Sequence, residues 1–282
     1  MRKRRTNREM NILKEGIFSM LKEDAPMTCR QVYYRLVSAG LIEKTENEYN
    51  NTTCRLLANM RRSGEIPYGW IADNTRWVRK PASYSNLEEM LTVTAKCYRK
   101  SLWMDTGVNV EIWLEKDALS GVLYDVTEEW DVPLMVTRGY PSLSFLHEAG
   151  QGLERSGKPA YIYYFGDYDP SGVDIPRVTE RELRKFAPNT EINFEILAVT
   201  GEEQIKELNL ITRPTKKSDM RSKKFTGESV EVDAIPSKIL RKMADQVISN
   251  HIPMEEIFRI KEIEEQERET LMRIAPYVAG NV

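Results

Sequence analysis

The chain has 282 residues, which suits one large domain or two of ordinary size, and 41% of them are hydrophobic, enough for a core. No apolar run is long enough to cross a bilayer, and the basic opening at residues 1–5 lacks the apolar region of a signal peptide. Membrane-spanning and secreted proteins are therefore not expected. Cys29, Cys54 and Cys97 lack metal-ligand spacing, so we expect a reduced, cytoplasmic protein.

The near-neutral total charge hides an asymmetry along the chain. Residues 1–80 hold 16 lysines and arginines against 9 aspartates and glutamates, a formal net charge of +7. Residues 81–282 hold 25 against 34, a net charge of −9. A basic unit favours a polyanionic partner, and an acidic unit favours cations. Ordinary solvated surface is the alternative.

Helical patterns open the chain. Apolar residues recur at helical spacing over residues 7–21. Thr28 and Gln31 form a capping box that predicts a second helix over residues 29–39. A third helix is expected over residues 46–63, where the following glycine ends it.

A hairpin is expected next, with strands at residues 66–71 and 75–79. Three helices followed by a hairpin are typical of a winged helix, so we predict a winged-helix DNA-binding domain over residues 1–82. A small helical domain with an exposed basic face is the alternative. Five arginines of the third helix and the hairpin are expected to contact DNA: Arg55, Arg61, Arg62, Arg76 and Arg79.

Tyr34, in the second predicted helix, is a candidate nucleophile. Its neighbour Tyr33 lies on the apolar stripe of that helix, and Tyr34 lies about 100° further round, on the face of Arg30. A guanidinium beside a phenol can stabilise the phenolate and can also bind a phosphate, as attack on a phosphodiester requires. The alternative is a packed tyrosine whose hydroxyl bonds to the backbone.

The rest of the chain alternates strands with helices, after a linker at residues 79–86. This alternation predicts an α/β fold with a mostly parallel sheet, which we place in residues 83–282 together with a C-terminal helical extension. Four strands are expected, at residues 108–114, 133–137, 160–165 and 192–199.

Polar residues follow three consecutive strands of this pattern. Glu115 follows the first, the turn at residues 138–141 follows the second, and Asp167 and Asp169 follow the third. The carboxyl ends of parallel strands share one edge of a sheet, so these groups are expected to converge. Carboxylate oxygens suit Mg²⁺, so we predict a magnesium site formed by the three acidic residues. A lone acidic residue before a helix can instead simply stabilise the helix dipole.

These motifs together resemble a known family. Glu115, the Gly-Tyr-Pro turn at residues 139–141 and the Asp-Tyr-Asp-Pro-Ser-Gly run at residues 167–172 resemble the Toprim domain of type IIB topoisomerase (topoisomerase VI) A subunits and of meiotic double-strand-break transesterases. The Arg-Gln-Val-Tyr-Tyr run at residues 30–34 is similar to the element that carries the family's nucleophile. Ser142 stands where the family usually has aspartate, and the chain also resembles compact Toprim proteins borne by mobile elements.

The resemblance covers residues 25–255 and implies a winged helix followed by a Rossmann-like Toprim domain that binds Mg²⁺. It implies that Tyr34 attacks a backbone phosphate of double-stranded DNA beside Arg30 and leaves a covalent protein–DNA end. Each chain would cut one strand, so a double-strand break requires a homodimer, in which the tyrosine of one protomer works with the metal of the other. Any ATPase would be a separate subunit, and a nucleoid-associated location would follow. A hydrolytic Toprim nuclease and a non-catalytic DNA-binding protein are the alternatives.

Two further acidic residues lie near the end of the predicted Toprim domain. Glu231 and Asp233 belong to a Glu-x-Asp-Ala-x-Pro element that resembles the end of such domains. They are expected to support the metal site or to cap a helix over residues 237–250, and the cap is favoured. A basic stretch at residues 212–226 predicts a loop near DNA, and a charged helix at residues 260–274 is a candidate interface.

Overall fold

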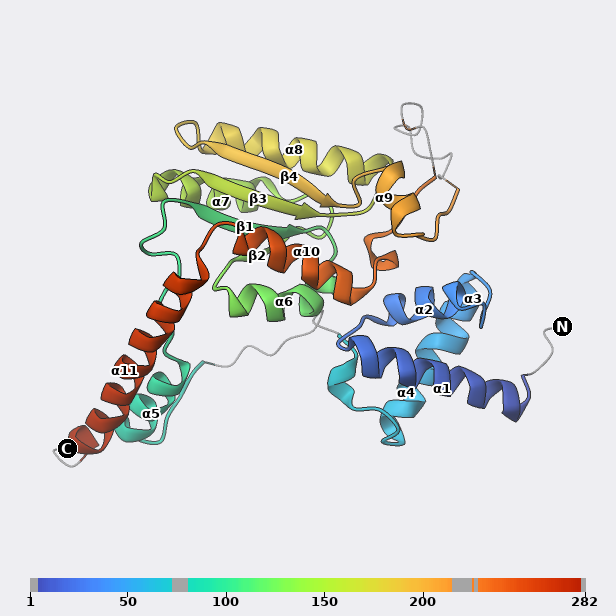
Figure 1. The fold of residues 1–282 in the computed structure, drawn as a ribbon, viewed down its shortest axis with the longest axis horizontal. Helices are drawn as coiled ribbons and strands as arrows, with labels where there is room; N and C mark the ends of the chain where they lie inside the picture. The colour runs from blue at the N-terminus through green and yellow to red at the C-terminus, as the bar shows by residue number, and fades with distance from the viewer. Residues whose placement is uncertain (1–4, 73–80, 215–224, 226–227, 280–282) are drawn as a thin grey trace.

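The computed structural model describes residues 5–72, 81–214, 225 and 228–279. It places an N-terminal helical unit beside a larger α/β unit, from which the helices α5 (Leu87–Cys97) and α11 (Met254–Ala279) project as a helical arm (Figure 1). Arg76 and Arg79 lie outside the described residues, and so does the whole of the hairpin strand expected at residues 75–79.

The N-terminal unit contains three helical regions, as the sequence predicts. The capping box of Thr28 and Gln31 forms at the start of the second. The helix expected over residues 46–63 is divided by a π-helical turn, whose Asn-Asn-Thr-Thr sequence consists of weak helix formers. The elements are α1 (Asn7–Asp24), α2 (Cys29–Ser38), α3 (Glu46–Glu48), the π-helical turn Tyr49–Cys54 and α4 (Arg55–Arg62).

The strand expected at residues 66–71 does not form. Tyr68–Trp70 is a turn of 3₁₀-helix, and Ile71 makes an isolated parallel bridge to Met27. Pro67 has no amide hydrogen for a sheet, which disfavours a strand at this place. The winged-helix assignment therefore stays a prediction.

The α/β unit contains the parallel sheet that the sequence predicts. Its four strands are all parallel and lie in the order β2-β1-β3-β4. Leu114 and Phe165 pair at the ends of β1 and β3, so the residues that follow them emerge at the same edge. The strands are β1 (Asn109–Leu114), β2 (Leu134–Val136), β3 (Ala160–Phe165) and β4 (Ile192–Ala198).

Helices cover both faces of the sheet and make a three-layered unit (Figure 1). α7 and α8 pack on one face over Trp113 and Tyr164, whereas α6 and α10 pack on the other over Ile112 and Phe165. Successive residues of a strand point to opposite faces, so Ile112 and Trp113 belong to different layers. The helices are α6 (Ser120–Glu129), α7 (Leu143–Ser156), α8 (Pro170–Phe186), the short α9 (Glu202–Glu207) and α10 (Ser237–Ser249).

Ion pairs hold the helical arm together. Lys100 Nζ lies 2.9 Å from Glu267 of α11, and Arg268 of the same helix donates a 2.9 Å hydrogen bond to the carbonyl oxygen of Tyr98. The charged helix expected at residues 260–274 is thus part of α11 and packs on α5.

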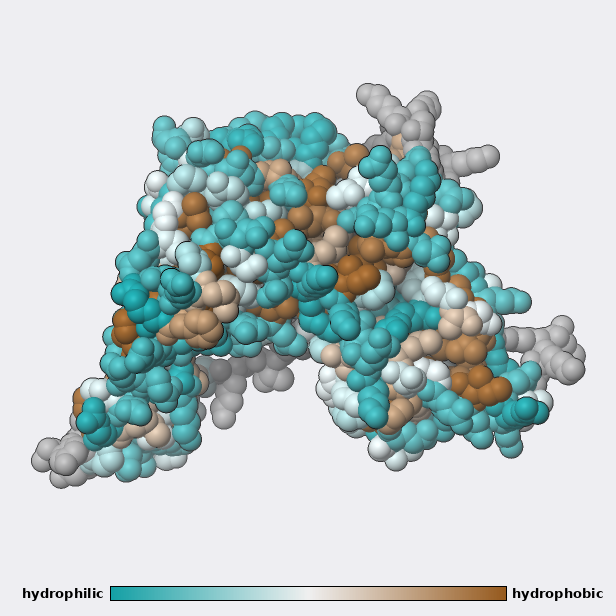
Figure 2. Space-filling view, viewed as in Figure 1, coloured by the Kyte–Doolittle hydropathy of each residue, from teal (hydrophilic) through white to brown (hydrophobic). Residues whose placement is uncertain are grey.

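The surface on the side shown in Figure 2 is largely hydrophilic, with smaller apolar patches over both units. Ile12 and Phe18 of α1 and Phe258 of α11 are among the exposed large apolar side chains. Among the helices that the structure describes, none is both long and apolar enough to cross a membrane.

Candidate functional site

Glu115 and Asp167 lie side by side at the carboxyl edge of the sheet. Glu115 follows β1, and its amide donates a 2.9 Å hydrogen bond to the carbonyl oxygen of Phe165 at the end of β3. The amide of Asp167 donates in turn to Glu115 Oε2, at 3.2 Å. The structure therefore brings together two of the three predicted metal ligands.

Asp169 begins α8, two residues further on. Its Oδ1 accepts hydrogen bonds from the amides of Ser171 (2.9 Å) and Gly172 (2.8 Å), which caps the helix. Gly172 also lies against Asp167, where a Cβ would be only 2.0 Å from the carbonyl oxygen. A glycine is therefore required for the tight turn that carries both aspartates.

The turn after β2 closes next to Glu115. The amide of Gly139 donates a 3.2 Å hydrogen bond to the Glu115 carbonyl oxygen, and φ is +86° at Gly139 and +56° at Arg138. This left-handed region favours glycine. Ser142, which replaces the aspartate of the resembled family, accepts a hydrogen bond from the amide of Phe145 and caps α7, as an aspartate would.

Burial makes the charged forms of both carboxylates at this edge unfavourable. The pKa of Glu115 is raised to about 7, mainly by burial and next by the negative charge of Asp167. Burial also raises the pKa of Asp167, against the charge of Lys116 and a 2.8 Å hydrogen bond from the amide of Val232. A positive charge placed here stabilises both groups.

Lys116 supplies such a charge, and it was not among the predicted site residues. Its Nζ lies 2.7 Å from Asp233 Oδ2, 3.2 Å from Asp167 Oδ1 and 3.4 Å from Glu231 Oε2. Burial opposes the ammonium form, but the three carboxylates outweigh it and raise the pKa of Lys116. The one signal in the sequence was its position directly after Glu115, and a lysine there is ordinarily exposed.

Glu231 and Asp233 adjoin Asp167, and the cap expected from them does not form. α10 begins after Pro236, whose ring cannot provide a side-chain cap. Asp233 is instead only 2% exposed and accepts a 3.2 Å hydrogen bond from Thr28 Oγ1 of the N-terminal unit. The two acidic residues therefore extend the carboxylate cluster toward α2.

The N-terminal unit docks on this edge through the first turn of α2. Arg30 Nε lies 3.9 Å from Glu231 Oε2, and Gln31 Nε2 donates a 3.3 Å hydrogen bond to the carbonyl oxygen of Ile235. Together with the hydrogen bond from Thr28 to Asp233, these contacts join three residues at the start of α2 to the segment before α10. We call this docked state the closed arrangement.

A second contact of the closed arrangement is centred on Asp24, at the end of α1. Arg241 of α10 lies 2.6 Å from its Oδ1, and Arg35 of α2 lies 3.4 Å from its Oδ2. Burial raises the pKa of Asp24 even though both arginines oppose the shift. This carboxylate therefore depends on its two cationic partners.

Tyr34 is only 5% exposed and belongs to the same buried core cluster of the N-terminal unit as Tyr33 and Leu36. The pKa of Tyr34 is raised, mainly by burial and next by the negative charge of Glu231. The positive charges of Arg30, Arg213 and Lys116 oppose this shift but do not cancel it. The stabilised phenolate expected beside Arg30 is therefore absent, because burial outweighs the guanidinium. These charges come from both units, so Tyr34 lies within the field of the carboxylate edge of its own chain.

Arg30 and Tyr33 have fixed partners near Tyr34. The Arg30 guanidinium stacks 4.0 Å from the ring centre of Tyr49 and lies 3.1 Å from Glu46. The Tyr33 hydroxyl donates a 3.2 Å hydrogen bond to the carbonyl oxygen of Thr45. Tyr33 therefore has the packed position on the core side that its sequence position predicts.

Three of the predicted DNA contacts lie on α4. Arg55 and Arg62 are exposed. Arg61 is half-buried, its Nε donates a 3.3 Å hydrogen bond to the Leu57 carbonyl oxygen, and its guanidinium lies 5.7 Å from the ring centre of Tyr68. Arg55 and Arg62 are therefore the arginines of this set that solvent reaches most readily.

The carboxylates suit Mg²⁺ in their chemistry, since Mg²⁺ binds carboxylate oxygens together with water and phosphate. Glu115 and Asp167 offer partly buried oxygens, and Asp169 has Oδ2, 4.0 Å from Arg213, in addition to the oxygen that caps α8. Across the described residues, however, no three His, Cys, Asp or Glu side chains lie together as a group that could hold a metal ion. The type of oxygen therefore suits the ion, but the described side chains are not grouped around one point for it, and Lys116 and Arg213 provide the neighbouring positive charges in this structure.

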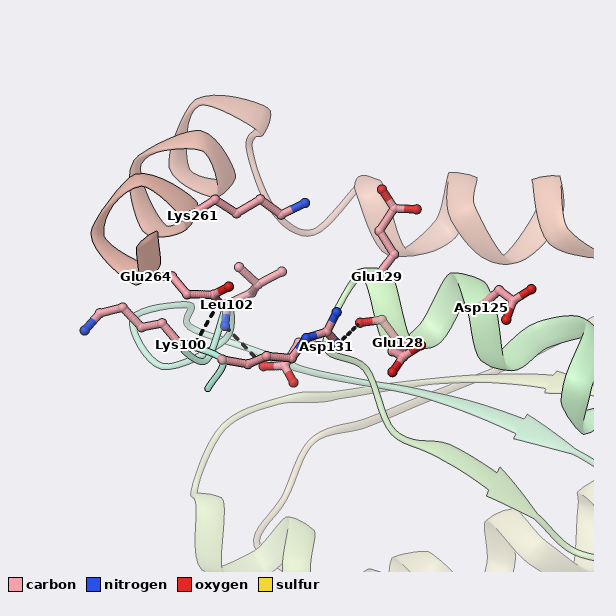
Figure 3. Close-up of a pocket in the computed structure, with 9 residues that line it drawn as sticks. Lys100, Leu102, Asp125, Glu128, Glu129, Asp131, Lys261 and Glu264 are labelled. Atoms are coloured by element: carbon pink, nitrogen blue, oxygen red, sulfur yellow. Dashed lines mark hydrogen bonds between the residues drawn. The ribbon is translucent and has the colours of Figure 1, made fainter. Parts of the chain in front are cut away.

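A charged hollow lies away from these carboxylates, between the arm and the end of α6 (Figure 3). Groups in its walls already have partners: the Lys100 amide donates to Glu264 at 2.8 Å, and Arg99 donates to the Glu128 carbonyl oxygen at 2.7 Å. Because α6 runs back from the carboxyl edge of the sheet, this hollow lies at the opposite edge. It joins the arm to the α/β unit and is not part of the candidate site.

No protein-family model matches the chain, and no curated protein matches it significantly. The structure itself defines the class, an α/β protein with a four-stranded parallel sheet. Its distinguishing feature is an acidic strand edge covered by a helical unit.

Proposed function

We propose that the protein cleaves double-stranded DNA by transesterification, with Tyr34 as the nucleophile. The observation that supports this most directly is the position of Tyr34 and Arg30 against the carboxylate edge of the same chain. Glu231 links them, because it pairs with Arg30 and Lys116 and is also the strongest charge acting on Tyr34. Attack on a phosphodiester needs a nucleophile, a phosphate-binding cation and a charge-stabilising site within reach of one phosphate.

In this reaction the phenolic oxygen of Tyr34 bonds to the phosphorus of a backbone phosphate, and the bond from phosphorus to a deoxyribose oxygen breaks. The phenol gives up its proton, and the released deoxyribose oxygen takes one up. Arg30 binds a phosphate oxygen through its guanidinium. Mg²⁺ held by Glu115, Asp167 and Asp169 would stabilise negative charge on the phosphate oxygens.

The Tyr34 side chain is only 5% exposed, so DNA reaches it after a change of conformation. In this proposal the contacts of Arg30 with Glu231 and of Asp24 with Arg241 separate in that change, and the exposed tyrosine of one protomer then works with the metal of the other. A homodimer presents two such sites to one duplex, so that each chain cuts one strand. An ATPase acts as a separate subunit in this proposal, and the protein is located with the nucleoid.

A hydrolytic nuclease is the second candidate, and the burial of Tyr34 favours it. Asp169 at the carboxylate edge is 26% exposed, so a phosphate can approach that edge more easily than it can approach the phenol. Water would then attack phosphorus in place of Tyr34, and no covalent intermediate would form.

End-labelled duplex DNA incubated with the protein and Mg²⁺, then separated on a denaturing gel, tests the proposal. Wild type is expected to give a slowly migrating, protease-sensitive adduct, and Tyr34→Phe none, with duplex affinity retained. Tyr33→Phe is the matched control, because it loses a hydrogen bond to Thr45 that contributes about 1 kcal/mol but keeps the nucleophile. Cut DNA without any adduct assigns hydrolysis. Mg²⁺ binding without cut DNA assigns a non-catalytic DNA-binding protein.

A further inference from the structure

The basic stretch at residues 212–226 reaches the candidate site through Arg213. The amide of Arg213 donates a 2.8 Å hydrogen bond to the carbonyl oxygen of Ser229, whose own amide donates back over the same distance. The next residue, Val230, makes the same kind of antiparallel bridge to Tyr168, which stands between the two aspartates of the candidate site. Two successive bridges therefore hold the backbone of Arg213 against the turn that carries those aspartates.

The side chain of Arg213 faces the carboxylate edge. Its Nη1 pairs with Glu231 Oε1, and its Nη2 lies 4.0 Å from Asp169 Oδ2. The second distance is too long for a hydrogen bond, and 34% of the arginine side chain is exposed. A guanidinium has five N–H donors, so Arg213 has donors left for a ligand that approaches Asp169.

Lys44 of the N-terminal unit meets the same segment beside Tyr34. Its Nζ donates a hydrogen bond to the carbonyl oxygen of Thr212 and lies 5.7 Å from the ring centre of Tyr34. Lys44 is exposed, and a carbonyl oxygen carries no net charge, so this bond leaves the charge of the ammonium uncompensated. Thr212 directly precedes Arg213, so the two cations meet where the N-terminal unit adjoins the carboxylate edge.

Two like charges are thus held close together. Partial burial lowers the pKa of Lys44, and the positive charge of Arg213 lowers it further, against the negative charges of Glu231 and Glu228. An anion bound between the lysine and the arginine would relieve their repulsion. Phosphate is an anion that both side chains recognise, lysine as a point charge and arginine through its fork of donors.

We propose that Lys44 and Arg213 form a phosphate clamp, which binds a backbone phosphate of DNA between Tyr34 and Asp169. Lys44 accompanies Tyr34, and Arg213 accompanies Asp169, so the clamp forms whether one chain or two supply the halves of the site. Arg30 is engaged with Glu46, at 3.1 Å, so the clamp adds cations to the one already assigned to the phosphate. The inference rests on the proposed function for its ligand and adds the residues that position that ligand.

Duplex binding by the full chain carrying Tyr34→Phe, in the presence of a chelator, tests the clamp without covalent or metal-dependent cleavage. Fluorescence anisotropy at several salt concentrations measures the log–log salt dependence of binding. Lys44→Met and Arg213→Gln, added singly, are each expected to make it shallower by about 0.9, and together by about 1.8. Glutamine keeps a donor for Glu231, and the Tm of each variant checks its folding.

Lys158→Met and Arg184→Gln are the matched controls, at the opposite edge of the sheet. Lys158 Nζ donates a 3.1 Å hydrogen bond to the carbonyl oxygen of Trp103, much as Lys44 donates to a carbonyl oxygen. Arg184 pairs with Glu180 at 2.7 Å. Both controls are expected to keep the salt dependence of the Tyr34→Phe protein.

The clamp is overturned if Lys44→Met leaves the salt dependence unchanged, and this exposed position decides the matter even where Arg213→Gln lowers the Tm. It is also overturned as a DNA site if both variants lose binding of inorganic phosphate in calorimetry while duplex binding keeps its salt dependence. A wild type that forms no adduct defeats the tyrosine reaction but does not alter these slopes. The two proposals therefore fail separately.

Discussion

The ammonium of Lys116 lies 2.7 Å from Asp233 Oδ2 and 3.2 Å from Asp167 Oδ1, so one cation joins the end of β1 to the segment before α10. The Asp233 side chain is buried, with 2% exposed, and the Asp167 side chain is partly buried, with 13% exposed. Glu231 Oε2, at 3.4 Å, completes the group. Lys116 is therefore the ion-pair partner of both Asp167 and Asp233, whereas Glu231 also pairs with Arg213.

Lys116→Met is expected to destabilise the protein by about 3 kcal/mol, because it leaves buried carboxylates without their cation. Urea unfolding in the presence of a chelator measures the loss. Lys100→Met is the control, since Lys100 pairs with Glu267, which is 41% exposed, and such pairs contribute about 1 kcal/mol or less. Equal losses in the two variants would contradict the proposed importance of the buried pair.

Asp169→Asn and Asp169→Ala separate the cap of α8 from the metal site. Asparagine caps a helix about as well as aspartate, whereas alanine loses the cap and about 1 kcal/mol. Both variants lack a carboxylate, so both are expected to lose the DNA cleavage and the Mg²⁺-dependent rise in Tm that we predict for the wild type. Only the alanine variant should have a lower Tm without metal. An asparagine variant that keeps the full Mg²⁺ effect would exclude Asp169 as a ligand.

Arg55→Ala and Arg62→Ala are expected to weaken duplex binding, because these exposed arginines of α4 are predicted phosphate contacts. Each lost contact should make the log–log salt dependence of binding shallower by about 0.9. Fluorescence anisotropy at several salt concentrations measures the slope. Arg177→Ala is the control, an exposed arginine of α8 that pairs with Asp174. The same slope in all four proteins would count against DNA binding by α4.

His251 makes stability depend on pH. Its Nε2 lies 2.7 Å from the Tyr163 hydroxyl, and burial lowers the pKa of His251 below its ordinary value of 6.5. As the pH falls, His251 therefore takes up a proton in the unfolded chain before it does so in the folded protein. The contribution of the neutral imidazole to the free energy of unfolding is full above pH 6.5 and is lost below it.

Urea unfolding from about pH 7.5 to about pH 5 should thus show a larger loss for wild type than for His251→Asn, which cannot titrate there. If the free energy of unfolding changes with pH by the same amount in both proteins, the lowered pKa of His251 is contradicted. Titration of the His251 imidazole by NMR in the folded protein measures the direction of the pKa shift independently.

Features that depend on near neighbours in the chain were predictable. Thr28 and Gln31 are three residues apart, and their capping box forms as the sequence indicates. The strands were recognisable because the apolar runs of a buried parallel sheet are continuous, and their order placed Glu115 and Asp167 at one edge. Local pattern and sheet topology were sufficient for these.

Features that depend on distant contacts or on backbone detail were not predictable. Lys116 meets Glu231 across 115 residues, so no spacing in the sequence marks it as part of the site. The burial of Tyr34 beside Tyr33 in the core of the N-terminal unit likewise depends on tertiary packing, which helical periodicity does not describe. Pro67 explains in retrospect why the first hairpin strand is replaced by a 3₁₀ turn.

The contacts of the closed arrangement have a consequence for synthesis of the chain. The bond between Thr28 and Asp233 spans 205 residues, and that between Asp24 and Arg241 spans 217. At translation rates of about 5–20 residues per second, the partner of Thr28 is made roughly 10–40 s after Thr28 itself. α2 therefore leaves the ribosome before its partners in the α/β unit exist, and the nascent protein can reach the closed arrangement only when synthesis is nearly complete.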